Sequence, residues 1–295
     1  MTEAALRSRG VEKEFGADDV VRGADLTVRE GEILLLMGPN GVGKTVLLSC
    51  LAGSQHPTEG SVEVFGEPVT EDGGDSLNFL LQDSMAVDTL TGRENVAFYS
   101  RLHHRFTDRW EAYVDRLGLA DDLDKLVKHY SEGMKRKIEL SLTMSVDVPV
   151  YLLDEPTAGV DLTNIQRFHD IILDQYDDGK TFLVSSHRPM DANIADRIAF
   201  MPDGTVSAVG TPEELMDAVP PVVRVTGSDA MRDAEAYVVD GQLFPLGGEA
   251  RGFLDESHDF EAVADELPDG SVERIDPTYT DLFNYYVHVQ GADDE

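Results

Sequence analysis

The chain has 295 residues, 41% of them hydrophobic, which is enough for one large domain with a substantial core and a smaller second domain. Its 57 acidic and 24 basic residues give a formal net charge of −33, and such a surface would repel DNA, RNA and anionic lipid headgroups. Because this charge repels itself unless counterions screen it, we expect an extreme halophile with molar internal salt as the host, rather than a mesophile with an acidic surface.

The sequence shows neither a disulfide nor a membrane anchor. Cys50 is the only cysteine, which favours a reducing compartment. The apolar runs at 33–37 and 148–153 are far shorter than the roughly 18 residues that span a bilayer, and the first ten residues, MTEAALRSRG, lack the apolar stretch of a signal peptide. We therefore expect any membrane role to come through partners.

Strand and helix patterns alternate along the first two thirds of the chain. Residues 11–28 alternate charged and apolar side chains and predict one or two short antiparallel strands. Continuous apolar runs, typical of strands buried on both faces of a mainly parallel sheet, lie at 32–37, 148–153 and 181–185. Helical patterns lie at 45–52, from Glu94 onward and at 108–117. This order predicts an α/β domain whose ligand lies at the carboxyl ends of the strands.

A domain boundary is predicted at 217/218, because a helix pattern at 213–218 is followed by Pro220 and Pro221. Residues 218–295 carry eighteen acidic and four basic residues and no lysine. Strand patterns at 222–225 and 237–239, a helix at 260–266 and an amphipathic segment at 280–289 predict a small α+β domain. We therefore divide the chain into residues 1–217 and 218–295.

A phosphate-binding loop of the form GxxxxGK[ST] follows the first buried strand and opens a helix. Its glycines let backbone N–H groups surround phosphates, its lysine reaches the β and γ phosphates, and its threonine hydroxyl can ligate magnesium. A chance match in an ordinary strand turn is the alternative. The loop residues, which we expect to bind ATP, are Gly38, Pro39, Asn40, Gly41, Val42, Gly43, Lys44 and Thr45.

Two carboxylates follow the second buried strand, about 110 residues after the phosphate loop. We expect Asp154 to bind Mg2+ and Glu155 to position and deprotonate the water that attacks the γ phosphate. Without the phosphate loop, two carboxylates after a strand would be a weak signal.

Residues 130–134 (YSEGM) resemble the LSGGQ signature of the ABC ATPase family, and the resemblance covers residues 5 to about 217. In that family this stretch binds the γ phosphate of ATP held by the opposite subunit, which the resemblance assigns to Ser131 and Gly133. Tyr130, Glu132 and Met134 depart from the pattern, and the Glu132 side chain should point away from an anionic ligand.

Four more residues are in register with the same family. The resemblance implies that Gln82 contacts Mg2+ and the attacking water near the membrane-domain interface, and that His187 contacts the γ phosphate and orients the catalytic groups. It places Asp161 in a loop that crosses a dimer interface, and Phe15 in the position that stacks on adenine. The alternatives are a surface glutamine, a structural histidine and a core phenylalanine.

The C-terminal segment resembles the accessory domain of export-type ATPases. Residues 276–283 (DPTYTDLF) are similar to the closing P-S-L-E-D-V-F of that family, and residues 282–286 (LFNYY) also resemble the ATPase of the copper and nitrous-oxide-reductase maturation exporter. A halophile-specific acidic appendage is the alternative.

The family resemblance implies a complete architecture and a set of partners. The fold is a P-loop α/β ABC ATPase core with an antiparallel β subdomain and a helical subdomain, plus the small C-terminal α+β domain. The cofactors are ATP and Mg2+, and the partners are a second ATPase subunit, as a homodimer, and integral membrane permease subunits, without nucleic acid. The resemblance also implies that the protein is cytoplasmic and lies peripherally on the cytoplasmic face of the cell membrane.

Two other classes of protein compete with this prediction. A soluble ABC ATPase acting on ribosomes or DNA would carry two cassettes or long coiled-coil insertions, and the net charge of −33 is hostile to nucleic acid. A P-loop kinase or GTPase would leave Ser131, Asp161 and His187 without a role.

Overall fold

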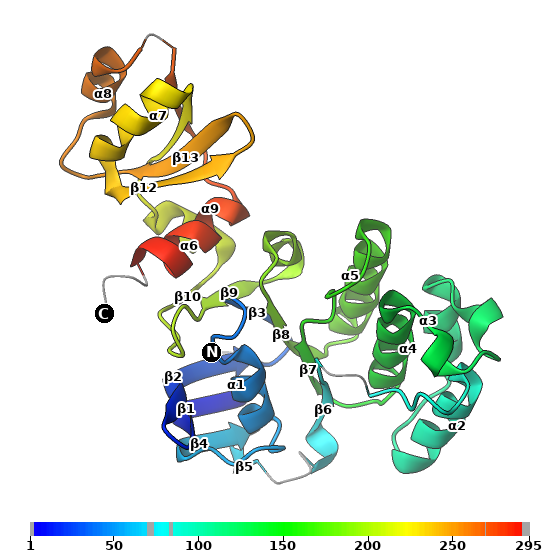
Figure 1. Cartoon of the computed structure of the whole chain (residues 1–295). Helices are drawn as coiled ribbons and strands as arrows, with labels where there is room; N and C mark the ends of the chain where they lie inside the picture. Colours follow the sequence, from blue (N-terminus) through cyan, green and yellow to red (C-terminus); the bar gives the residue numbers. More distant parts are fainter. Residues whose placement is uncertain (1–2, 70–73, 83–84, 269, 291–295) are drawn as a thin grey trace.

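The computed structural model describes residues 3–69, 74–82, 85–268 and 270–290, and these form three sheets with helices between and around them (Figure 1). The central sheet has six strands in the order β10-β9-β3-β8-β7-β6, parallel except for β10. Its strands are β3 (Ile33–Met37), β6 (Leu77–Leu80), β7 (Val150–Asp154), β8 (Thr181–Ser186), β9 (Arg197–Phe200) and β10 (Ala208–Gly210).

The apolar runs in the sequence follow from the position of these strands. In β3, Ile33 and Leu35 point into one hydrophobic core and Leu34 and Leu36 into a second core on the other face. A strand covered on both faces needs apolar side chains at every position, which confirms the prediction of a doubly covered sheet. The predicted strands at 32–37, 148–153 and 181–185 are confirmed, with ends that differ by one or two residues.

An antiparallel sheet covers one face of the central sheet. Its order is β2-β1-β4-β5. Helix α1 (Lys44–Leu51) lies between the two sheets and buries Leu47 and Leu48 there. The strands predicted within 11–28 are confirmed but are longer. The first of them starts at Ala4, which pairs with Arg29, before the alternation of charged and apolar residues begins. The four strands are β1 (Ala4–Phe15), β2 (Asp18–Arg29), β4 (Glu59–Val64) and β5 (Glu67–Pro68).

Helices cover the other face of the central sheet and extend into a helical subdomain. Helix α4 (Glu132–Met144) and helix α5 (Leu162–Asp177) contribute to the core on that face. Thr91 caps α2 in a capping box with Glu94, which explains the helix start near Glu94. The subdomain has its own core and contains α2 (Gly92–Leu102), α3 (Trp110–Arg116) and the 3-10 turns η2 (Ala120–Asp122) and η3 (Val127–His129).

Short elements complete this part of the chain. Residues of the 3-10 turn η4 follow β8 and lead into β9, and α6 begins with a Thr211 capping box and Pro212. These elements are η1 (Gly74–Ser76), η4 (Pro189–Ile194) and α6 (Pro212–Ala218).

The third sheet follows Pro220 and Pro221 and is antiparallel, in the order β12-β13-β11-β14. The predicted strand at 222–225 and the helix at 260–266 are confirmed, whereas the strand predicted at 237–239 begins at Val238 and is longer. The elements are β11 (Val222–Thr226), α7 (Ser228–Ala234), η5 (Glu235–Tyr237), β12 (Val238–Leu246), β13 (Glu249–Leu254), α8 (Phe260–Glu266) and β14 (Val272–Ile275).

The chain then returns to the part that contains the central sheet. Helix α9 (Tyr279–Asn284) and the π-helical turn η6 (Tyr285–Val289) pack beside α6 and η4, as Figure 1 shows for α9 and α6. The Tyr286 ring stacks on Phe200 of β9 at a centroid distance of 4.8 Å, and its hydroxyl donates to the Leu215 carbonyl. The domain boundary at 217/218 stays a prediction; residues 1–2 and 291–295 of the two predicted domains lie outside the described residues.

The helices of the structure were compared with the length and hydropathy that a membrane span needs. Of the helices that the structure describes, none is both long and apolar enough to cross a bilayer.

Candidate functional site

The phosphate loop joins β3 to α1, as the sequence predicts, and two of its glycines are required by close packing. A Cβ on Gly38 would lie 2.2 Å from the Met201 carbonyl oxygen. Gly43 has φ 108° and caps α1, and a Cβ there would lie 2.7 Å from the Val20 carbonyl oxygen. Larger residues would therefore displace the loop from the neighbouring strands.

The start of α1 presents backbone N–H groups and one buried ammonium. Gly43 offers no side chain to cap the helix, so the first N–H groups are available to an anion. Lys44 is 4% exposed, and its Nζ donates to the carbonyls of Gly38 and Pro39, each at 2.9 Å. Burial lowers the pKa of Lys44, although the nearby Glu155 carboxylate acts in the opposite direction. These donors form a cradle of the kind that holds polyphosphates.

Asp154 ends β7 with a carboxylate that is fully buried and only half satisfied. Ser185 on the neighbouring strand β8 donates to Oδ1, whereas Oδ2 has no hydrogen-bond partner among the described residues. Burial raises the pKa of Asp154 against the opposing effect of the hydrogen bond from Ser185. A buried carboxylate oxygen without a donor is suited to a cation.

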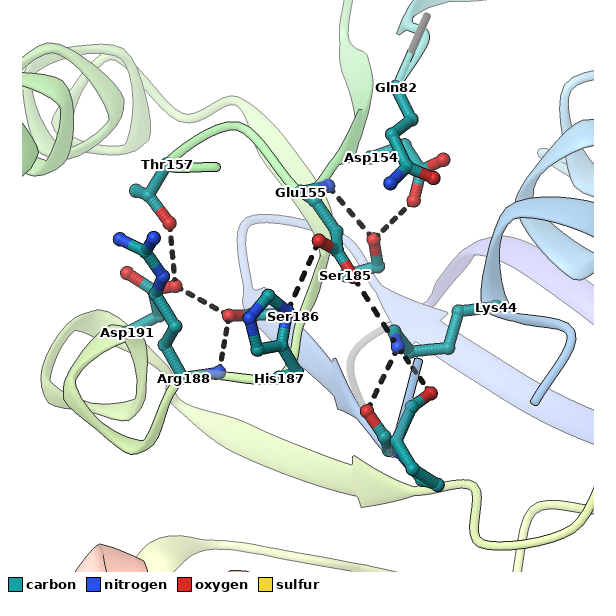
Figure 2. Close-up of polar contacts among 12 residues, drawn as sticks. Lys44, Gln82, Asp154, Glu155, Thr157, Ser185, Ser186, His187, Arg188 and Asp191 are labelled. Atoms are coloured by element: carbon teal, nitrogen blue, oxygen red, sulfur yellow. Dashed lines mark hydrogen bonds and ion pairs between the residues drawn. The ribbon is translucent and has the colours of Figure 1, made fainter. Parts of the chain in front are cut away.

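The other predicted magnesium ligands lie at the same place. The Thr45 hydroxyl donates to Oε1 of Gln82 at 3.1 Å, and Figure 2 shows the Gln82 side chain beside Asp154. Hydroxyl, amide and carboxylate oxygens are the ligands that Mg2+ prefers. The three residues therefore fit a magnesium ion, although they come from α1, the segment after β6, and β7.

Glu155 lies between the lysine and the histidine that the sequence singles out (Figure 2). Its Oε1 is 3.5 Å from Nζ of Lys44, and its Oε2 is 3.1 Å from Nδ1 of His187. Its backbone adopts φ 44°, an uncommon conformation for glutamate, and its N–H donates to the Ser185 hydroxyl at 3.0 Å. The strained turn therefore holds the carboxylate between Lys44 of the phosphate loop and His187.

Ser131, Gly133 and Asp161 lie at the N-termini of α4 and α5. The Ser131 hydroxyl accepts from the Met134 N–H and caps α4, and Asp161 caps α5 by accepting from Asn164. A Cβ on Gly133 would lie 3.5 Å from the Gly159 carbonyl. The Glu132 side chain is 85% exposed, as expected for a carboxylate that points away from an anionic ligand. No hydrogen bond among the described residues connects Ser131 or Gly133 to the phosphate loop.

Phe15 ends β1 with a ring that is available for stacking. It is 47% exposed, and Nζ of Lys13 lies 5.2 Å from the ring centroid. An exposed ring beside a cation can pack against a base, which agrees with the adenine-stacking role that the resemblance implies.

Arg136 is a site residue that the sequence analysis missed. It is 5% exposed, and its guanidinium donates to the carbonyls of Leu81 at 2.6 Å, Glu155 at 3.1 Å and Pro156 at 3.2 Å, and to that of Asp154. Helix α4 is thus fastened to the segments that carry Gln82 and the two carboxylates. In the sequence Arg136 stands between Lys135 and Lys137, and nothing there distinguishes a buried cation from exposed ones.

The family model described as ABC transporter matches residues 21–158. A daunorubicin resistance ATP-binding protein of Streptomyces coeruleorubidus is 32% identical, over 99% of this chain and 98% of the relative. A fluoroquinolones export ATP-binding protein of Mycobacterium tuberculosis is 34% identical over 71% of this chain and 72% of its own length. A Nod factor export ATP-binding protein of Burkholderia orbicola is 32% identical over 79% and 81%.

Solved structures share the fold. One described as the ATP-binding subunit of an ABC transporter superposes with a TM-score of 0.65 at 22% identity, and covers 72% of this chain and 92% of its own. An ATP-binding cassette in the ADP conformation superposes with a TM-score of 0.61, also at 22% identity, over 72% and 93%.

Proposed function

The chain belongs to the ABC transporter family and is an ATP-binding, ATP-hydrolysing subunit, and from this premise we propose that it powers export through separate membrane-spanning subunits. Membership of this family leaves no reason to prefer a P-loop kinase or GTPase. The single observation that carries the catalytic part is the position of Glu155 between Lys44 and His187.

The chemistry that we propose is attack of water on the γ phosphorus of ATP. The new bond is between the water oxygen and phosphorus, the bond from phosphorus to the bridging oxygen of ADP breaks, and Glu155 accepts the water proton. Lys44 and the N-terminus of α1 stabilise the phosphate charge, and His187 orients Glu155. Thr45, Gln82 and Asp154 would hold Mg2+, which supplies charge neutralisation to the β and γ phosphates when it is bound.

We propose that the working unit contains two ATPase subunits, and a homodimer is the simplest form. Among the described residues, no hydrogen bond connects Ser131 or Gly133 to the phosphate loop of their own chain. In our proposal they therefore complete the ATP site of the partner subunit. Ser131, at the N-terminus of α4, is exposed, as a residue that binds a phosphate of another subunit must be. Asp161 would lie at the same interface.

A groove beside Gln82 supports a membrane partner. It has a volume of about 800 Å3 and is lined by Leu81, Met85, Leu102, His103 and Arg105, among others. Leu81 and Leu102, which line it, are 38% and 61% exposed, and Phe98 in the adjoining pocket is 45% exposed. We therefore propose that an apolar segment of a membrane-spanning subunit docks in this groove at the cytoplasmic face.

The cargo is proposed from the relatives. Those named for daunorubicin resistance, fluoroquinolone export and Nod factor export favour outward transport of organic molecules. The copper-exporter hypothesis rested on residues 282–286, where Leu282 and Tyr286 pack into the core. Because packing accounts for these residues, we do not extend the proposal to copper.

Two substitutions test the ATPase assignment. Glu155→Gln should retain ATP binding, lose turnover and accumulate an ATP-bound dimer, because the phosphate cradle survives without the base. Lys44→Ala should lose ATP binding instead. Size-exclusion chromatography with ATP at high salt measures the dimer. A Glu155→Gln protein that stays monomeric, or one that hydrolyses ATP at the parent rate, would contradict the assignment.

Export itself is tested by reconstitution. The chain is co-expressed with the membrane subunit that co-purifies with it, and the pair is placed in liposomes with the ATPase subunits outside. ATP-dependent accumulation of daunorubicin inside the liposomes is expected, and the same complex carrying Glu155→Gln is the control. ATP-driven release of preloaded cargo would instead establish import.

A further inference from the structure

A buried carboxylate outside the phosphate cradle accepts hydrogen bonds from side chains on three segments of the chain. Asp191 lies on η4 and is 1% exposed. Its Oδ2 accepts from the hydroxyls of Thr157 at 2.9 Å and Ser186 at 2.5 Å, and Nε2 of His169 on α5 lies 2.8 Å from its Oδ1. Figure 2 shows the Thr157 and Ser186 contacts. The carboxylate is therefore satisfied at both oxygens.

The two hydroxyl donors flank the proposed catalytic pair. Thr157 is two residues after Glu155, in the loop that follows β7. Ser186 immediately precedes His187 at the end of β8, and its hydroxyl also accepts from the Arg188 N–H at 2.9 Å. Asp191 thus connects the loop behind Glu155 to the turn that carries His187, whose Nδ1 lies 3.1 Å from Glu155.

We propose that Asp191 is a positioning residue, which fixes the separation of Glu155 and His187 by holding Thr157 and Ser186 on a single carboxylate. The proposal rests on the catalytic roles proposed above for Glu155 and His187. Asp191 itself lies behind the pair and has no role in proton transfer.

The chemistry of the network requires a carboxylate at this position. Only an ionised carboxylate is an acceptor at both oxygens, so it can receive two hydroxyls and an imidazole N–H together. In the Asp191→Asn variant one of these oxygens would be replaced by an NH2 group, which repels a donor. Burial raises the pKa of Asp191, but the hydrogen bonds from His169 and Ser186 outweigh it and hold the pKa below the usual range.

The test compares substitutions that differ in one hydrogen bond. Thr157→Val removes the hydroxyl at nearly constant shape, Thr157→Ser restores it, and Asp191→Asn removes the charge. Asp170→Asn, at an exposed position on α5, is the matched control for loss of one charge. Steady-state ATP hydrolysis is measured for each variant and divided by the number of sites that bind a fluorescent ATP analogue, so that unfolded protein does not lower kcat.

We expect Thr157→Val and Asp191→Asn to lower kcat by about tenfold to a hundredfold with the KM for ATP within about twofold, because displacement by a fraction of an ångström misaligns the pair without touching the phosphate cradle. Thr157→Ser and Asp170→Asn should keep the parent kcat. Equal losses in Thr157→Ser and Thr157→Val would overturn the proposal, since the hydroxyl would then not matter.

Glu155→Gln and His187→Ala are measured in the same series. If both are inactive while Thr157→Val and Asp191→Asn keep the parent kcat, the positioning role of Asp191 is wrong and the proposed catalytic pair stands. If all four keep the parent kcat, the proposed catalytic pair fails, and the positioning role fails with it.

Discussion

The Lys44 ammonium is held in a buried site before any phosphate arrives. Burial lowers its pKa, so the folded chain releases this proton at a lower pH than the unfolded chain, whose lysine has the ordinary value of 10.5. Between these two pKa values the unfolded chain binds more protons, and the free energy of unfolding therefore rises with pH. Below this window the buried charge is present in full and weakens the fold.

ATP should reverse this shift and bring a proton with it. Because the phosphates place negative charge beside Lys44, its pKa should rise on binding, and the complex should take up protons at alkaline pH just below 10.5. Isothermal titration calorimetry in buffers of different ionisation enthalpy measures the uptake, which should be absent at pH 7. Lys44→Arg is the control, since its guanidinium stays protonated throughout, and equal uptake by this variant would exclude Lys44 as the source.

The residues that we propose for ATP binding and hydrolysis were predictable where their chemistry requires a local pattern. The glycines of the phosphate loop, Lys44 and the Asp154 and Glu155 pair stand in short stretches directly after apolar strands. Asp191 and Arg136 act through contacts with segments far away in the chain, 34 residues away for Thr157 and 55 for Leu81. Such contacts leave no local pattern, so sequence analysis could not find them.

The attachment of helix α4 to the rest of the protein depends on the buried Arg136. Arg136 and Glu139 lie on its buried face 3.5 Å apart, and Oε1 of Glu139 also accepts from the N–H groups of Met85 and Ala86. Burial lowers the pKa of Arg136, and the Glu139 carboxylate opposes this effect. This ion pair therefore anchors α4 on both sides of Gln82. Arg136 binds the Leu81 carbonyl before it, and Glu139 binds the N–H groups of Met85 and Ala86 after it.

Arg136→Ala should destabilise the protein by about 3–5 kcal/mol, because it removes one partner of a buried ion pair together with several donors to backbone carbonyls. Guanidinium denaturation followed by fluorescence measures the loss. Arg116→Ala is the matched control, since Arg116 makes a surface ion pair with Asp174 that should contribute only about 0–1 kcal/mol. Similar losses in the two variants would show that the buried contacts of Arg136 contribute little.

Helix α2 offers the apolar surface that we assign to the membrane partner. Leu102→Asp should weaken capture of the co-expressed membrane subunit by at least about tenfold, because it places a charge where an apolar side chain is to be buried. Affinity pull-down from detergent extracts measures the capture. Leu246→Asp, at a similarly exposed leucine on β12, should leave it unchanged, and equal loss in both would place the contact elsewhere.

Elements were predictable where the hydrophobic pattern is simple. The strands buried on both faces and the helix at 260–266 were found within two residues, since burial alone fixes their composition. Strand β4 and helix α5 were not predicted, although the spacing of Ile165, Phe168, Ile171 and Ile172 is that of a buried helix face. The return of α9 to the core was not predictable, because an amphipathic pattern does not say which surface it covers.

The charge of the whole molecule is unevenly distributed. Residues 218–295 carry an excess of 14 acidic residues over 78 positions, against an excess of 19 (39 acidic, 20 basic) over the first 217. The screening length is roughly 30 Å at about 0.01 M salt and roughly 3 Å at 1 M, so repulsion acts across a whole domain only at low salt. We therefore expect the third sheet to be the part of the protein most sensitive to salt.

Limited proteolysis across a potassium chloride series should show this order. At 0.05 M salt we expect early cuts near Pro220 and Pro221 and within the third sheet, while the central sheet stays protected, because the denser charge loosens first. At 3 M salt both parts should resist the protease. Equal protection of the third sheet at the two concentrations would contradict the prediction.

The return of α9 and η6 to the core means that the third sheet is held at both of its ends. Backbone cleavage at Pro220–Pro221 would leave two fragments that still co-elute, joined by the stacking of Tyr286 on Phe200. A chain shortened at residue 217 would uncover the Phe200 ring and remove the helix that packs against η4, the segment that carries Asp191. Removal of the third sheet and α9 would thus affect the ATP site, because α9 packs against η4, which carries Asp191 behind the proposed catalytic pair.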